Sequence, residues 1–248
     1  MNKETKYKIW QAVGVSTVSI LLIVALSWGH RQTPSSVPCE EVVYFFSDAS
    51  QRMYVSEEEL NALLEKEQLF PVGKSIGSVA LYRMERLFSE HSMIRSAECY
   101  LTPRHTVQVD LSQRIPLLRV EKDEETYFVD TDRKRMPYRP AVTDSVPVIK
   151  GAVTEEMACA ELAGYAKWLQ GNRYWRERVS HLDVRTPKMI HLYLKGAGQP
   201  RIILGEIDGY KAKLAKLRTY FEEGAAVTQD KEYTELDLRF KDQVIGRK

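Results

Sequence analysis

Cysteine is scarce in this sequence, which has only Cys39, Cys99 and Cys159 among its 248 residues. An odd and sparse set of this kind excludes a scaffold stapled by disulfides. No C-x-x-C pair is present either, so the motif of a zinc ribbon or a thioredoxin-like redox site is missing. With 44% hydrophobic residues, the chain must form its core by burying apolar side chains.

An excess of one charge is also missing. The sequence has 36 Lys and Arg residues against 34 Asp and Glu residues, which gives a formal net charge of +2. A nucleic-acid-binding domain carries a clear basic excess, and a polyanion-binding tail carries a run of like charges. The sequence therefore predicts no nucleic-acid partner.

The motifs of nucleotide binding and of serine hydrolysis are incomplete. Gly73-Lys74-Ser75 resembles the end of a P-loop, but the glycine that this loop needs five positions earlier is Gln68. We interpret the segment as a turn between two helices. Neither a G-x-S-x-G elbow nor an S-x-x-K pair occurs, so an exported serine hydrolase would lack its nucleophile signature.

The remaining candidate site residues have structural interpretations. His181 and His191 are expected on neighbouring strands, but no third metal ligand lies near them. The acidic groups at 123–125 and 155–156 fall in a predicted turn and at a predicted helix start. Four aromatic residues permit either a sugar-stacking platform or core packing, which we favour: Tyr165, Trp168, Tyr174 and Trp175. The sequence predicts no catalytic residue, metal, cofactor or small-molecule substrate.

One long apolar run stands near the beginning of the chain. The 19 residues from Trp10 to Trp28 would span about 28 Å as a helix, close to the thickness of a bilayer core, with a tryptophan at each interface. Lysines precede the run, so the positive-inside rule predicts a cytoplasmic tail over 1–9, a transmembrane helix over 10–28 and an exported remainder. A secretory signal cleaved after 25–27 is the alternative. Residues 29–39 read as a polar linker.

Residues 40–116 have the pattern of a small domain of order strand, helix, helix, strand, strand. The β-branched and aromatic run 42–46 predicts the first strand. A capping box at Ser56 begins one helix, and apolar residues at helical spacing predict another within 78–92. Two strands over 97–101 and 106–111 then flank a turn. The pattern predicts a three-stranded sheet covered by two helices.

Residues 117–248 predict a second α+β unit, a mixed β-sheet with flanking helices. Helices are expected from Thr154 to Gly171 and from Gly209 to Gly224. Strands are expected over 117–121, 126–130, 181–184, 190–194, 201–204 and 236–240. In the last strand, alternation places Leu236, Leu238 and Phe240 on one face and Asp237 and Arg239 on the other.

This layout resembles the bacterial division family FtsQ/DivIB, whose members have one membrane span, a POTRA domain and a second β domain. Segments similar to the family patterns are 55–60, 103–109, 114–117, 127–130, 136–137, 146–151 and 203–205. The strongest piece is Leu236-Asp237-Leu238-Arg239-Phe240, which is similar to the family's D-L-R-Y signature. The glycine usual after that signature is missing, and Arg133 replaces a turn glycine.

The resemblance implies a non-catalytic scaffold in the cytoplasmic membrane at the division septum. Such a protein links early division proteins to FtsB-like and FtsL-like partners and helps to control septal peptidoglycan synthesis. Two alternatives remain open: a POTRA chaperone of outer-membrane protein assembly, and an anchored cell-wall enzyme. The docking mode that we expect is addition of a partner strand to an exposed sheet edge.

The predicted partner-binding residues lie at the end of the sequence: Phe240, Lys241, Gln243, Val244 and Ile245. The last strand of a chain commonly lies at a sheet edge, and Phe240 stands where the family has a tyrosine that the resemblance marks as contacting the partner. The alternative is that Phe240 and Val244 cap the hydrophobic core.

Overall fold

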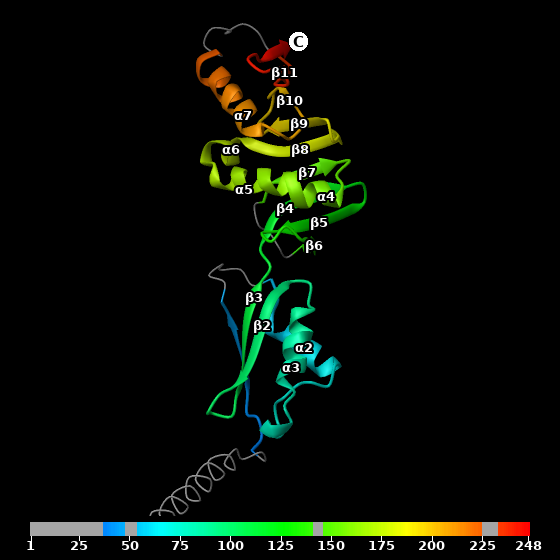
Figure 1. Ribbon diagram of the computed structural model, residues 1–248, viewed down its shortest axis with the longest axis vertical. Helices are drawn as coiled ribbons and strands as arrows, with labels where there is room; N and C mark the ends of the chain where they lie inside the picture. The colour runs from blue at the N-terminus through cyan, green and yellow to red at the C-terminus, as the bar shows by residue number, and fades with distance from the viewer. Residues whose placement is uncertain (1–36, 48–53, 141–145, 225–232) are drawn as a thin grey trace, which may run out of the picture. The chain divides into compact units, whose positions relative to one another are not determined.

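The computed structural model describes residues 37–47, 54–140, 146–224 and 233–248 (Figure 1). They form two compact units, the first made of 37–47, 57–88 and 97–111, and the second of 54–56, 89–96 and the rest from 112 onward. The predicted tail, the predicted transmembrane helix and most of the predicted linker lie outside the described residues. Within the described ranges, no helix is both long and apolar enough to cross a membrane.

The first unit has the predicted order of elements. Its sheet has the order β1-β3-β2, and β1 runs parallel to β3. Helices α2 and α3 lie along one side of these strands (Figure 1). The elements are β1 (Val42–Phe46), α2 (Glu57–Lys66), the 3-10 turn η1 (Ile76–Ser78), α3 (Leu81–Ser89), β2 (Ile94–Leu101) and β3 (Val107–Gln113).

Period-two and helical spacing together explain the core of this unit. Every second residue of β3 is buried, beginning with Val107. On the helices, Leu60 and Leu64 of α2 lie one turn apart and are fully buried, as are Met84 and Phe88 of α3. The apolar face of the sheet is therefore the face that the helices cover.

The second unit is built on a nine-stranded mixed sheet of order β12-β11-β10-β9-β8-β7-β4-β5-β6. Three pairs in it are parallel, β4 with β7, β7 with β8 and β10 with β11. The strands are β4 (Pro116–Lys122), β5 (Glu125–Asp130), β6 (Arg135–Pro137), β7 (Val148–Gly151), β8 (Val179–Thr186), β9 (Met189–Leu194), β10 (Arg201–Gly205), β11 (Glu235–Asp237) and β12 (Ile245–Arg247).

Two helical stretches pack on this sheet, and both contain a π segment. The first comprises α4 (Glu155–Met157), η2 (Ala158–Leu162) and α5 (Ala163–Gly171), followed by α6 (Arg173–Arg178); the second comprises α7 (Tyr210–Thr219) and η3 (Tyr220–Gly224). The predicted start at Thr154 is confirmed, since its side chain accepts a hydrogen bond from the Met157 N–H.

The core of the second unit lies between these helices and the sheet. Leu162 and Leu169 of the first helical stretch, with Leu214 and Leu217 of α7, are buried against alternate strand residues such as Leu192. Two of the aromatic residues offered for sugar stacking, Tyr165 and Trp175, are almost fully buried in the same cluster. Core packing is therefore the correct reading for these two rings.

The strand predicted over 236–240 is wrong beyond Asp237. Strand β11 covers only Glu235–Asp237, and the chain bends at Phe240. The Asp237 carboxylate accepts a hydrogen bond from the backbone N–H of Arg239, which competes with continued strand pairing. Alternation also fails here, because Leu236, Asp237 and Leu238 are all buried.

Candidate partner-binding edge

The nine-stranded sheet ends in two different strands, and a partner strand could add to either end. Within the described residues, β12 pairs only with β11, and β6 pairs only with β5. An outermost strand offers backbone N–H and C=O groups on its free side, which is the basis of β-augmentation. The chemistry of the two ends therefore decides which one is the better docking site.

Strand β12 is held on its inner side by a regular antiparallel register. Ile245 lies opposite Asp237, Gly246 opposite Leu236, and Arg247 opposite Glu235. The ring of Tyr233 packs directly on Gly246, where any added Cβ would come within 2.5 Å of ring atoms. A glycine is thus required at the centre of β12 for this ring to lie against the strand.

Two buried carboxylates on β11 bind arginines from the surrounding segments. Glu235 accepts from Arg201 Nε of β10 at 3.1 Å and from Arg247 of β12 at 3.2 Å. Asp237, with no exposed surface, accepts from Arg239 Nε at 2.9 Å and lies 3.7 Å from the Arg247 guanidinium. These ion pairs connect β10, β11 and β12.

The same contacts perturb the protonation of Asp237. Hydrogen bonds from the Arg239 side chain favour the ionised carboxylate and hold the pKa of Asp237 below its usual value. Burial acts in the opposite direction, and the nearby charges of Arg239 and Arg247 add to the lowering. The carboxylate is therefore ionised at neutral pH, as its role in the ion pairs requires.

A lysine of α7 holds the bend that leads from β11 toward β12. The Lys216 ammonium donates to the carbonyl of Leu238 at 3.2 Å and to those of Phe240 and Lys241. In the described part of the chain, these carbonyls lie outside the strands, and an ammonium group with three N–H donors can bind several of them. Partial burial lowers the pKa of Lys216.

The five predicted partner-binding residues lie in this region but do not share one strand. Phe240 is 46% exposed, and Lys241 and Gln243 are exposed, all outside the ladder. Val244 packs partly against the core, and only Ile245 belongs to β12. Sequence reasoning assigned no binding or structural role to four charged residues of this region: Lys216, Glu235, Asp237 and Arg247. The carboxylates at 235 and 237, which alternate with leucines, were a visible signal.

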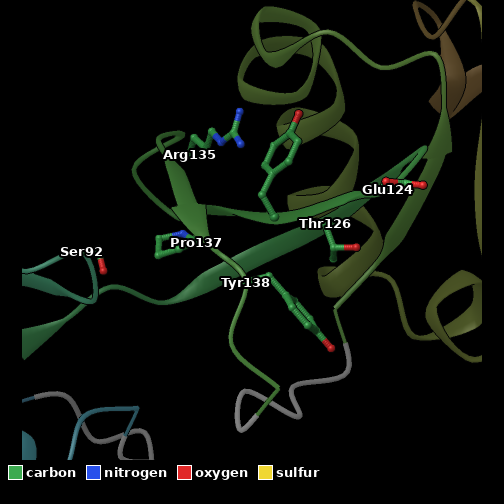
Figure 2. Close-up of a pocket in the computed structure, with 7 residues that line it drawn as sticks. Ser92, Glu124, Thr126, Arg135, Pro137 and Tyr138 are labelled. Atoms are coloured by element: carbon green, nitrogen blue, oxygen red, sulfur yellow. The ribbon is translucent and has the colours of Figure 1, made fainter.

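The opposite end of the sheet has the features of a protected edge. Figure 2 shows Arg135, Pro137 and Tyr138 around a recess at β6, which Tyr127 also lines. Pro137 has no backbone N–H to donate to a partner strand. Arg135 pairs with Glu125 and Glu155, and its guanidinium lies 4.3 Å from the centre of the Tyr127 ring. Strand β12 is equally short, so the proline is the feature that makes β6 the poorer template for addition.

The other candidate motifs lie away from this edge. Gly73 has a φ of +80°, and Lys74 Nζ donates to the Gln68 carbonyl at 2.7 Å, so the G-K-S segment is the predicted turn. His181 and His191 occupy the neighbouring strands β8 and β9 as predicted, and His181 stacks on Tyr193. In the described part of the chain, no cluster of His, Cys, Asp and Glu could hold a metal ion.

Two models of known protein families together match almost all of the described chain. Residues 115–247 match the family model described as FtsQ/DivIB, C-terminal related. Residues 37–112 match the model of a POTRA-like domain. No curated protein matches the chain significantly.

Proposed function

Because the chain belongs to the FtsQ/DivIB C-terminal-related family of bacterial cell division, we propose that it is a non-catalytic scaffold of the division complex. In this proposal it is anchored in the cytoplasmic membrane through residues 10–28, with both folded units outside the cytoplasm. It captures FtsB-like and FtsL-like partners and so helps to control septal peptidoglycan synthesis. The observation that carries the proposal is the outermost strand β12, which has one side unpaired within the described sheet.

Strand β12 is the better docking site of the two outermost strands, because it has no proline and because contacts on its inner side hold it in place. It contains no proline, whereas β6 ends in Pro137. Its inner side is fixed by the Glu235–Arg247 ion pair and by the Tyr233 ring. A strand that is already held in extended form loses little conformational entropy when a partner adds to it.

Specificity would come from the side chains around the free side of β12. Phe240 is an exposed aromatic residue at the bend that Lys216 holds in place. Aromatic residues are enriched among those that contribute most to binding at protein interfaces. We therefore propose Phe240 as the main side-chain contact, with Lys241, Gln243, Val244 and Ile245 lining the rest of the docking edge.

The test compares two exposed aromatic residues at opposite ends of the same sheet. Phe240→Ala is measured beside Tyr138→Ala, because Tyr138 is 41% exposed near β6. Full-length variants are expressed in cells, crosslinked and purified, and the FtsB-like partner is quantified in each eluate. Thermal melts accompany the pull-downs. We expect Phe240→Ala to lose the partner while costing about 1 kcal/mol or less of stability, because half of the ring is already in water.

The outcomes separate the docking edge from its alternatives. Partner capture lost in Phe240→Ala and kept in Tyr138→Ala supports the β12 edge. The reverse pattern places docking at β6, and capture unchanged in both variants contradicts edge docking. Depletion tests the wider role: filamentous cells support a division scaffold, whereas loss of outer-membrane proteins with normal division supports a POTRA chaperone.

A further inference from the structure

Among the described residues, helices cover one face of the sheet in the first unit and leave exposed side chains on the other. Tyr44 of β1 points toward the helices, where its hydroxyl donates to Asn61 Oδ1 at 2.7 Å and its ring lies edge-on to Phe88. The next residue, Phe45, points to the opposite face and is 50% exposed. Tyr100 of β2 is likewise 40% exposed next to the buried Cys99. In Figure 1 both helices lie on the other side of this sheet.

A carboxylate lies between these two exposed rings. The β1–β3 register places Phe45 beside Asp110, and the Tyr100 hydroxyl donates to Asp110 Oδ2 at 3.0 Å. Gln108 Nε2 donates to Asp110 Oδ1 at 2.9 Å. We call the residues of this face the open-face patch: Val43, Phe45, Glu98, Tyr100, Gln108 and Asp110.

The patch carries negative charge and no cation. Asp110 and Glu98 are its two ionisable acids, and no Lys or Arg belongs to it. In the described part of the chain, neither carboxylate forms an ion pair. Each Asp110 oxygen accepts one hydrogen bond and has a further lone pair available. The patch therefore has free acceptors for a charged donor.

In the second unit, two arginines each lie against an aromatic ring and pair with a carboxylate. The Arg135 guanidinium lies over the Tyr127 ring and pairs with Glu155 at 3.2 Å. The Arg218 guanidinium lies 4.6 Å from the Tyr174 ring centre and pairs with Glu222 at 2.7 Å. In both cases an arginine lies against a ring and a carboxylate together, because its flat cation can stack and pair at once.

We propose that the open-face patch binds an arginine side chain of a partner protein. The guanidinium stacks on the ring of Phe45 or Tyr100 and pairs with the Asp110 carboxylate. Glu98 adds attraction for basic residues nearby. This site lies in the first unit and does not depend on docking at β12, so either proposal can fail without the other.

The experiment uses the full-length protein in detergent micelles, with 4-fluorophenylalanine in place of Phe45 as a fluorine NMR reporter. Three capped heptapeptides of the form Gly-Ser-Xaa-Gly-Ser-Xaa-Gly are titrated, with Xaa as Arg, Lys or Glu. We expect a saturable shift with the Arg peptide, weaker binding of the Lys peptide and no shift with the Glu peptide. Asp110→Asn removes one charge pair and should weaken the Arg peptide about fivefold.

Glu65→Gln is the matched control, because Glu65 is an exposed acid on α2 and not on the open face. It should leave the affinity for the Arg peptide unchanged. Equal responses to the Arg and Glu peptides, or equal losses in Asp110→Asn and Glu65→Gln, would overturn the proposal. If thermal melts show that Asp110→Asn does not fold, Glu98→Gln replaces it. This variant should bind the Arg peptide about twofold more weakly. An unchanged affinity in Glu98→Gln would also overturn the proposal.

Discussion

Replacement of Asp237 by alanine tests whether the buried charges hold the last strands together. The change removes the acceptor of the Arg239 backbone N–H and of the Arg239 guanidinium. A hydrogen bond to a charged group contributes about 1.5–3 kcal/mol. The side chains of Arg239 and Arg247 remain 39% and 56% exposed, so water recovers part of the loss. We therefore expect a net cost of about 2 kcal/mol.

A cost of this size should lower the melting temperature of the second unit by about 4–8 °C. The assay is thermal unfolding of the full-length protein, with amide hydrogen exchange of residues 233–248 as a local readout. Asp237→Asn keeps a neutral acceptor and should cost about half as much. Asp132→Ala is the control, because Asp132 forms a surface ion pair with Arg95 and such pairs contribute little. Equal melting temperatures for Asp237→Ala and Asp132→Ala would refute the reasoning.

Two further predictions concern the hairpin formed by the antiparallel strands β11 and β12. The pKa of Asp237 is lowered in the folded state, so the stability that its carboxylate contributes is complete above the unfolded pKa near 3.9 and is lost as pH falls through the folded pKa. Acid titration followed by hydrogen exchange should show this loss of stability. The Asp237→Asn variant should not show it. Gly246→Ala should lower the free energy of unfolding by about 1–3 kcal/mol, because the added Cβ would clash with the Tyr233 ring. Gly164→Ala on α5 is the control, because a Cβ there meets no neighbour within 4 Å, and it should leave the melting temperature unchanged or raise it.

Local signals in the sequence predicted most elements of both units. Thr154 marks its helix because its side chain can cap the N–H three residues on, and this contact depends on neighbours in sequence alone. The turn at 102–105 is equally local, and the Thr102 N–H bonds to the Thr106 carbonyl across it. Such contacts need no knowledge of the rest of the fold.

The order of the strands and the candidate docking edge depended on partners far apart in sequence. Alternation predicted a strand at 236–240, but the arginines that let Glu235 be buried come from β10 and β12. Lys216, which holds the bend at Phe240, comes from α7. A period-two pattern shows which residues share a face; it does not show which strand or helix will cover that face.

The acids of β11 also have a consequence before the fold is complete. In the unfolded chain, Glu235 and Asp237 are solvated charges on either side of Leu236, so this segment is a poor template for aggregation. Its burial becomes favourable only when Arg201 and Arg247 are close enough to neutralise Glu235. Pairing with β10 and β12 therefore brings in the arginines that offset the cost of burying Glu235, and while the segment is unpaired its charges oppose strand addition between chains.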